Sequence, residues 1–408
     1  MTEQQSRRQV NLIYLSLLAV LIGIVTGYGA VGFRSLIGLI HNISFNGVIS
    51  FYYDANKFTA PSSLGIWIVL VPVAGAIVVT FLVKNFAPEA KGHGVPEVMD
   101  AVYYKAGEIR PAVVVVKSIA SAISIGTGGA VGREGPIVQI GSAFASMVGG
   151  WLGLAPWQRI TLVAAGAGGG IAATFNTPLG AVLFAVELML PEISVRTFMP
   201  VALATSTATF VGRLYFGYQP SFSLPGNLLG LNNISLSMVI VFVGLGIIIG
   251  LAATLYIRAV YWSEDFFEEH IANEYLRHII GMFIVGVIFT TLLFSFGHYF
   301  VEGVGYATIE SILKGGLSLG WMLLLLFVAK LCATSITLGA GASGGIFSPA
   351  MFLGATLGGA YGALATYLMP GETASIAAFA MIGMAAMVGS STGAVLTAII
   401  MVFEMTLD

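Results

Sequence analysis

The chain has little charge, one cysteine and no basic stripe. Asp, Glu, Lys and Arg make up only 9% of its 408 residues, whereas soluble domains average about 25%. Because hydrophobic residues reach 57% and mean hydropathy is +0.93, the composition predicts an integral membrane protein. The net charge of −2 offers nothing to neutralise phosphates, which excludes nucleic acid as an expected partner. A lone Cys332 in an apolar run excludes an internal disulfide and predicts a thiol packed in the core.

Apolar segments of helical length follow one another along most of the chain. We expect helices near 11–40, 63–84, 112–125, 136–153, 160–173, 178–190, 199–216, 235–262, 278–297, 318–338, 349–368, 373–388 and 392–406. Several are shorter than the ~20 residues that cross the hydrocarbon core, so we expect a bundle of tilted and partial helices. The charged stretch 263–277 predicts an interfacial helix or loop with a solvated acidic face.

The two halves of the chain repeat one pattern at a constant spacing. Residues 126–141 (GTGGAVGREGPIVQIG) and 339–354 (GAGASGGIFSPAMFLG) superimpose after a shift of 345 − 132 = 213 residues. The same shift carries Lys117 onto Lys330, and it sets the Gly-Ala-Val-Leu of 180–183 on an identical sequence. We therefore predict a duplicated membrane unit whose glycine-rich loops break helices at matching places. In transporters, this arrangement marks an ion or substrate site near the bilayer midplane.

The repeat divides the chain into four expected parts: a cytoplasmic N-terminus at 1–10, a first membrane repeat at 11–218, a linker at 219–234 and a second membrane repeat at 235–408. The N-terminus is assigned to the cytoplasm because the basic pair Arg7 and Arg8 precedes the first span. Segment 197–216 has no counterpart, since the shift carries it beyond Asp408. We therefore expect the second repeat to lack its final helices, and we expect no cytoplasmic regulatory domain.

Four glycine-rich or polar stretches each lead into a proline that opens an apolar helix: Gly92–Pro96, Gly132–Pro136, Thr177–Pro178 and Gly345–Pro349. Proline is favoured at the first helical position, and the glycines before it leave backbone N–H groups uncovered. Helix starts that converge on one point would offer N–H donors and positive dipole ends to an anion. The alternative is a set of ordinary helix N-termini at the membrane surface.

One acidic residue, Glu134, stands at such a helix start. An ionisable carboxylate inside a membrane protein is costly and is by itself a prediction of function. At a helix start suited to anions, this carboxylate can occupy the anion site itself and leave when it is protonated. Glu134 is therefore a candidate gate and proton carrier. The alternative is a surface glutamate that caps the helix opened by Pro136 and pairs with Arg133.

These segments resemble the signature segments of the CLC family of chloride channels and chloride/proton antiporters. The resemblance rests on GHGVP at 92–96, GREGP at 132–136, GVGY at 303–306 and GGIFSP at 344–349, and it continues through 176–187 and 393–406. It implies an all-α integral membrane protein of the cell membrane with a CLC-type fold of two inverted repeats. It also implies a homodimer, in which each subunit transports chloride or a similar small anion, with protons as a candidate second substrate. Neither enzymatic activity nor a cofactor is implied.

The same resemblance assigns roles to individual residues. It implies that Glu134 is the external gating glutamate. Backbone N–H groups of Ile346 and Phe347 are implied to line a central anion site, and the donors from Gly132 to Gly135 an outer one. The implied anion-binding set is His93, Gly132, Arg133, Gly135, Ile346 and Phe347.

Three departures from the family pattern matter. The usual GSGIP segment carries a serine hydroxyl for the anion, and His93 stands there instead. Imidazole still offers an N–H and becomes cationic near its ordinary pKa of about 6.5; the alternative is a side chain turned away and bonded to backbone. The internal proton-transfer glutamate of coupled members belongs to a Glu-Glu pair that reads Glu187–Leu188 here. The family's central tyrosine lies in the final helices that this sequence lacks.

Channel and coupled antiporter both stay open at this point. Leu188 cannot relay a proton and favours passive or weakly coupled conduction. Glu134 together with Glu187 or an internal water path would support exchange through a non-standard proton route.

Two other classes of protein are weaker alternatives. An organic-anion transporter would also use broken helices, but it would need basic clamps, and the apolar segments near the motifs offer only Lys117, Arg133 and Lys330. A membrane-embedded hydrolase would use Glu134, His93 and Ser348, residues that anion-directed helix starts already explain.

Overall fold

The protein is almost entirely helical, as the sequence predicts. The computed structural model describes residues 9–224, 236–369 and 374–406, and within those ranges it contains fifteen α-helices and no β-strand. The expected N-terminal segment 1–10 and the expected linker 219–234 lie mostly outside the described residues.

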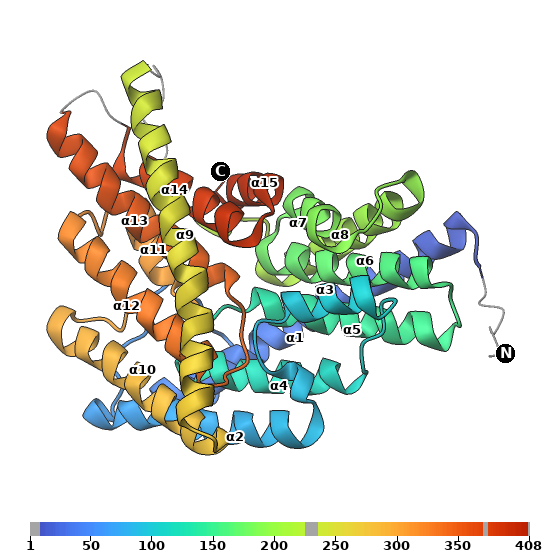
Figure 1. Cartoon of the computed structure of the whole chain (residues 1–408), viewed down its shortest axis with the longest axis horizontal. Coiled ribbons are helices and arrows are strands. Elements are labelled where there is room, and N and C mark those ends of the chain that lie inside the picture. Colours follow the sequence, from blue (N-terminus) through green and yellow to red (C-terminus); the bar gives the residue numbers. More distant parts are fainter. Residues whose placement is uncertain (1–8, 225–235, 370–373, 407–408) are drawn as a thin grey trace.

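Figure 1 shows the two halves of the chain side by side, the first in blue to green and the second in yellow to red. The first half contains α1 (Leu12–His41), α2 (Val71–Phe86), α3 (Val95–Tyr104), α4 (Ala112–Gly126), α5 (Glu134–Trp151), α6 (Pro156–Phe175), α7 (Pro178–Phe184) and α8 (Val195–Phe216). The second half contains α9 (Leu236–His270), α10 (Glu274–Phe296), α11 (Tyr306–Leu313), α12 (Gly320–Gly339), α13 (Phe347–Leu368), α14 (Ile376–Thr392) and α15 (Val395–Thr406).

Each apolar segment expected from the sequence coincides with a helix, and two short helices lie outside those segments. α3 and α11 are 10 and 8 residues long and contain Glu97 and Glu310, so neither presents an apolar run of spanning length. The stretches long and apolar enough to cross a membrane are Leu12–Asn46, Gly65–Phe86, Met238–His270, Glu274–Phe296 and Gly320–Gly339. The mixture of long and short helices agrees with the expected bundle of partial spans.

The charged stretch 263–277 comprises the end of α9, which runs without a break for 35 residues, a short connection and the start of α10. Glu268 pairs with Lys91 at 2.8 Å and with Arg277 at 3.2 Å, and Glu264 lies 3.4 Å from Lys91. The side chains of Glu264 and Glu268 are 33% and 48% exposed. The interfacial position of this stretch stays a prediction.

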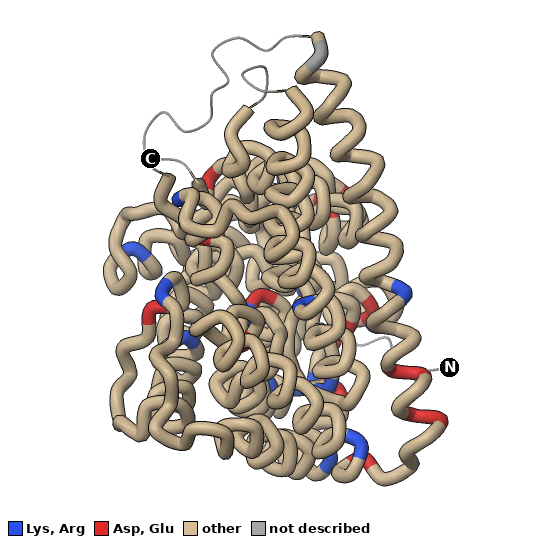
Figure 2. The backbone as a smooth tube through the Cα atoms, turned by 90° about the vertical axis from the view of Figure 1, so that its left-hand side faces the viewer, with Lys and Arg blue, Asp and Glu red and all other residues tan. Residues whose placement is uncertain are grey.

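The outer face of the bundle is apolar. Figure 2 shows that most positions along the backbone are neither Lys, Arg, Asp nor Glu. α9 and α10 expose large apolar side chains such as Ile240, Leu251 and Phe283. Cys332 is exposed on α12, so the prediction of a core thiol was wrong. In a membrane protein, residues of an apolar run face either the lipid or the packed interior, so the run alone does not show that a residue is buried in the protein.

The helices reproduce the predicted repeat. Shifting Glu134, the first residue of α5, by 213 gives Phe347, the first residue of α13, and α3 to α7 correspond in order to α11 to α15. α5 packs on α6 and α13 packs on α14 through glycine contacts so close that a Cβ at Gly141 or Gly354 would overlap a carbonyl of the facing helix. The backbones approach because these positions carry no side chain.

Candidate functional site

The two repeats meet through a reciprocal pair of backbone hydrogen bonds. The N–H of Gly132 donates to the carbonyl of Gly345, and the N–H of Gly345 donates to the carbonyl of Gly132, each at 2.7 Å. These glycines are repeat equivalents, so the contact lies at the local axis that relates the two halves. A Cβ on Gly135 would overlap the carbonyl of His93, which explains why the loops that meet here are built from glycine.

Two buried lysines fix the loops on either side of this contact. Lys117 donates to the carbonyls of Ala90 and Gly92 at 3.0 and 2.9 Å. Its repeat equivalent, Lys330, donates to two carbonyls at 2.9 and 2.8 Å, those of residues 301 and 303. Neither lysine has exposed surface. Their side-chain nitrogens are therefore occupied by the backbone carbonyls that precede α3 and α11. They are not free to clamp a substrate carboxylate.

Glu134 is buried at the start of α5, with 1% of its surface exposed. The hydroxyl of Tyr306 donates to Glu134 Oε1 at 2.5 Å, and the N–H of Ser348 donates to Oε2 at 3.2 Å. The Ser348 hydroxyl also donates to Oε1 and lies 2.7 Å from the Tyr306 hydroxyl. The alternative of a surface glutamate is therefore wrong, and no ion pair joins Glu134 to Arg133 among the described residues.

Tyr306 and Ser348 are functional candidates that the sequence reasoning missed as partners of the glutamate. The signal was present, because a shift of 213 carries His93 onto Tyr306, and Ser348 is the residue that follows Phe347 in the motif. What the pattern lacked was the direction of each side chain. His93 and Tyr306 occupy equivalent places in the two repeats but line different cavities.

A cavity of about 510 Å³ lies on one side of Glu134, and we call it the outer vestibule. Its lining includes Arg34, Arg133 and Arg213. Each guanidinium lies over an aromatic ring, at 4.2 Å for Arg34 on Phe216 and 5.1 Å for Arg133 on Tyr306, and at 5.7 Å for Arg213. Within the described residues, none of the three arginines pairs with an acid. Asp54 also lines the vestibule, so three arginines and one acid leave an excess of positive charge facing an arriving anion.

A second cavity, of about 180 Å³, lies on the other side, and we call it the inner cavity. It is lined by residues from several helix starts and from α9, namely His93, Gly135, Leu188, Tyr256, Ile346 and Phe347. The Tyr256 hydroxyl donates to the carbonyl of Ile346 at 3.2 Å. The predicted anion-binding residues thus divide between different places: Arg133 lines the vestibule, whereas His93, Gly135, Ile346 and Phe347 line this cavity. Gly132 lies at the backbone contact with Gly345 between the repeats.

The predicted proton-path residues Glu187 and Leu188 point to different surroundings. Glu187 accepts from the N–H of Leu396 at 3.1 Å and from Thr397 N and Oγ1 at 2.7 and 2.6 Å, so it caps the start of α15. Leu188 lines the inner cavity and presents no proton carrier to it. Glu187 therefore caps the N-terminus of α15, and the wall of the inner cavity at Leu188 is apolar.

The helix start at Thr177–Pro178 does not join the others. Glu404 accepts from the N–H groups of Leu179 and Gly180 at 3.2 and 2.8 Å. Because the N–H groups of Leu179 and Gly180 are already satisfied, this one of the four listed helix starts agrees with the alternative of an ordinary helix N-terminus. No group of three or more His, Cys, Asp or Glu side chains in the described ranges is placed to hold a metal ion.

Comparisons with known proteins agree with this architecture. A family model described as voltage gated chloride channel matches residues 75–408. The H(+)/Cl(-) exchange transporter ClcA of Vibrio vulnificus is 33% identical over 95% of this chain and 81% of its own length. The ClcA of Yersinia pseudotuberculosis is 31% identical over 99% of this chain and 82% of its own length.

Solved structures show the same fold. A slow cyanobacterial Cl−/H+ antiporter superimposes with a TM-score of 0.83 at 24% identity, covering 96% of this chain and 89% of that chain. A CLC-type fluoride/proton antiporter gives a TM-score of 0.78 at 22% identity, covering 97% and 91%. The protein is a multi-pass integral protein of the cell membrane and has the expected CLC-type fold. The chain therefore belongs to the voltage gated chloride channel (CLC) family, whose members are transporters or channels rather than enzymes.

Proposed function

We propose that the protein moves chloride or a similar small anion from the outer vestibule past Glu134 to the inner cavity. Anion transport as such is supported by the curated relatives, which are named H(+)/Cl(-) exchange transporters. One observation carries the assigned route. Arg133, Glu134 and Gly135 are consecutive, and the first lines the vestibule, the second is buried, and the third lines the inner cavity.

Glu134 acts as the gate because its carboxylate takes donors that an anion would use. Its oxygens accept hydrogen bonds from Tyr306 and from the N–H and hydroxyl of Ser348. An anion can take this position only if it displaces the Glu134 carboxylate or if Glu134 is protonated and so loses its negative charge. Three oxygens, one each from Glu134, Tyr306 and Ser348, lie in mutual contact, and the two hydroxyls supply only two hydrogens. Protonated Glu134 would supply a third.

We propose that proton coupling is loose. The position that carries the internal glutamate of coupled family members is Leu188, which lines the inner cavity and cannot exchange a proton. The nearby carboxylate of Glu187 is held by the start of α15, so it would have to leave that helix to act as a relay. The names of the relatives favour the second candidate function, chloride/proton exchange through a non-standard route.

We propose that His93 binds the anion from the inner cavity, together with the N–H groups of Ile346 and Phe347. His93 lines that cavity and its ring meets Tyr261 edge-on, with ring centroids 6.4 Å apart. The imidazole is larger than a serine hydroxyl, so it narrows the cavity while it still supplies an N–H donor.

We also propose the homodimer that the resemblance implies, with one pathway in each subunit. In mixed dimers, a parent subunit beside a Glu134→Gln subunit should show two independent anion pathways. A single averaged activity would refute separate pathways.

The deciding experiment is transport by purified protein in liposomes. Chloride efflux should exceed that of a labelled dicarboxylate by orders of magnitude, because Lys117 and Lys330, which are buried beside the route, are held by carbonyls. The reversal potential should follow the chloride gradient and change little with an imposed pH gradient. A fixed whole-number stoichiometry would favour the exchanger, and preferred dicarboxylate transport would refute the proposed route.

A further inference from the structure

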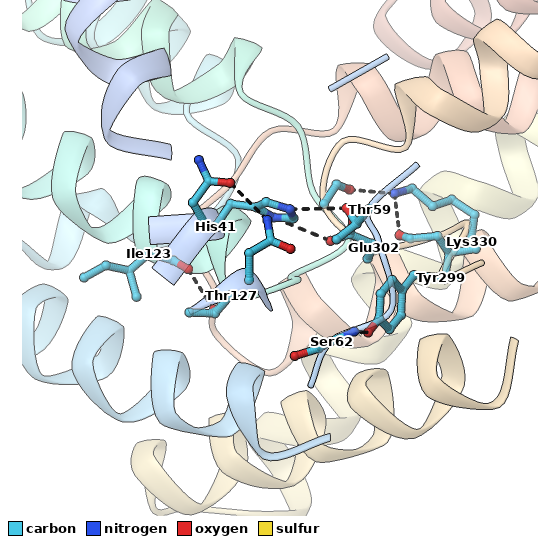
Figure 3. Close-up of polar contacts among 12 residues, drawn as sticks. His41, Thr59, Ser62, Ile123, Thr127, Tyr299, Glu302 and Lys330 are labelled. Carbon is cyan, nitrogen blue, oxygen red and sulfur yellow. Dashed lines mark hydrogen bonds and ion pairs between the residues drawn. The ribbon is translucent and has the colours of Figure 1, made fainter. Parts of the chain in front are cut away.

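A second cluster of ionisable side chains lies beside the gate, and the transport route described above does not use it. His41 ends α1, Thr59 lies in the segment between α1 and α2, and Glu302 lies in the loop before α11 (Figure 3). The Thr59 hydroxyl donates to Glu302 Oε1 at 2.5 Å and lies 3.2 Å from His41 Nε2. His41 Nδ1 lies 3.9 Å from Glu302 Oε2. His41 is 3% exposed and Glu302 9%.

An account of the hydrogens shows that this cluster has room for one more proton. Thr59 has one hydroxyl hydrogen, which it donates to Glu302, so it accepts from the N–H at His41 Nε2. In neutral imidazole the other ring nitrogen, Nδ1, then carries only a lone pair. It faces Glu302 Oε2, a buried oxygen that has no hydrogen-bond partner. Two acceptors lie 3.9 Å apart, and a proton on either of them would replace their repulsion by an attraction that favours closing this gap to a hydrogen bond.

Burial opposes a positive charge on the imidazole, and the aromatic rings around it act in the opposite direction. The His41 ring is stacked on Phe45 with centroids 4.7 Å apart and is tilted against Tyr53 at 4.2 Å. Aromatic faces attract cations, most strongly where water is excluded. No such stabilisation is available to a neutral ring that lies opposite an unpaired carboxylate oxygen.

The other ionisable groups around the cluster are already engaged. Lys330 donates to the carbonyls on either side of Glu302, and Lys57 pairs with Asp54 at 3.6 Å. The Tyr299 hydroxyl accepts from the N–H of Ser62 at 3.1 Å. His298, which stacks on Phe58 with ring centroids 4.2 Å apart, is the exception, because its buried Nδ1 has no hydrogen-bond partner among the described residues. The contact between His41 and Glu302 is the open place for a proton in this part of the described structure at which an imidazole nitrogen lies opposite a carboxylate oxygen.

Two connections lead from the cluster to the gate. A cavity of about 20 Å³, room for one water, is lined by Thr59, Glu302 and Tyr306. Lys330 grips the backbone on both sides of Glu302, four residues before Tyr306, and its ammonium interacts electrostatically with Glu302 and with Glu134. A change of charge at Glu302 therefore reaches the gate through this lysine and through the loop that carries Tyr306.

We propose that His41, Thr59 and Glu302 form a proton-binding site that tunes the pH at which Glu134 opens. When the site does not hold the additional proton, the negative charge of Glu302 favours protonation of Glu134. When the site holds that proton, this influence is cancelled and Glu134 stays ionised and bound to its donors. The coupling half of this proposal rests on the proposed role of Glu134 as the gate, whereas proton binding by the cluster does not.

The first test measures proton binding directly. The imidazole resonances of ¹⁵N-histidine protein are followed by NMR from pH 5 to 8, and His41 is assigned by its loss in the His41→Asn variant. We expect His41 to gain a proton within this range. In Glu302→Gln, an isosteric change that removes the charge, the midpoint should fall by about one pH unit. A His41 that stays neutral from pH 5 to 8, or one whose midpoint is unchanged in Glu302→Gln, would overturn the proposal.

The second test measures the coupling. Glu302→Gln should move the pH of half-maximal chloride efflux downward by about one unit, because the nearby negative charge is gone. In a Glu134→Gln background, the same change should have no effect. Glu310→Gln is the matched control, since Glu310 is a buried acid of α11 that is paired with Lys314 at 2.8 Å, and its profile should match the parent. An unshifted Glu302→Gln profile, or an equal shift in the control, would refute the coupling.

The two tests separate this inference from the proposed function. If Glu134→Gln leaves the pH profile of transport unchanged, the gate assignment fails, while the NMR titration still decides whether the cluster binds a proton.

Discussion

Removing the hydroxyl of Tyr306 is the sharpest test of how the gate is held. Tyr306→Phe deletes the donor to Glu134 Oε1 and keeps the ring. The ring supports the guanidinium of Arg133 at 5.1 Å and packs edge-on against Phe222 with centroids 5.4 Å apart. The substitution therefore removes one hydrogen bond to the carboxylate and the contact with the Ser348 hydroxyl, and it leaves the wall of the vestibule in place.

The size of the effect follows from the charge of the acceptor. A hydrogen bond to an ionised group contributes about 1.5–3 kcal/mol, and about 1.4 kcal/mol corresponds to a factor of ten. Loss of the Tyr306 hydroxyl should therefore make the gating position of the carboxylate about 10- to 140-fold less favourable. Ser348 donates to the same oxygen, so Ser348→Ala should act in the same direction. The double variant should fall short of the sum, because the two hydroxyls also contact each other.

Chloride efflux from liposomes at pH 7.5 and 4.5 measures this effect. We expect Tyr306→Phe to raise the rate about tenfold or more at pH 7.5, and much less at pH 4.5, where protonation already releases the gate. Tyr361→Phe is the control, because the Tyr361 hydroxyl donates to Val241 between α13 and α9 at 3.0 Å, far from Glu134 in the hydrogen-bond network. If Tyr306→Phe and Tyr361→Phe give the same rates at both pH values, the hydroxyl does not hold the gate.

Three further predictions concern the gate, the proton route and the inner cavity. Glu134→Gln should remove the gate's pH dependence from anion efflux, because the amide cannot titrate; an unchanged profile in purified protein would show that Glu134 is not the gate. Proton movement should be weakly tied to chloride movement because Leu188 carries no proton; a tight stoichiometry in reversal-potential measurements would point instead to Glu187 or to internal water. His93→Ser should restore a hydroxyl donor and change the ratio of nitrate or fluoride flux to chloride flux severalfold; an unchanged ratio, together with an unchanged pH profile from 5 to 7, would remove His93 from the pathway.

Much of the fold could be predicted from local patterns. A membrane helix needs a long apolar run, and such runs are read directly from the sequence. The shift that relates Lys117 to Lys330 also predicted which loops are equivalent, and both lysines grip carbonyls in equivalent loops. The short helices α3 and α11 escaped this reading because they are packed by neighbours rather than defined by their own apolar length.

The candidate site could be predicted only in part. The motif identified Glu134, since a carboxylate at a glycine-rich helix start is unusual in a membrane protein. It did not identify the hydroxyls of Tyr306 and Ser348, because they come from the other repeat, 172 and 214 residues away along the chain. Contacts between repeats depend on how the halves face each other, which no local spacing records.

The sequence by itself determined the class of protein, the helices, the repeat and the carboxylate at the helix start, because each depends on composition or on spacing along one segment. Only the tertiary structure decided which donors are free. The N–H groups at the start of α7 donate to Glu404, and those at the start of α15 donate to Glu187. The tertiary structure also turned Cys332 outward and brought His41 and Glu302 together. In each case the physical reason is the same: a side chain is satisfied by whatever lies beside it in space, and its neighbours along the chain do not specify that partner.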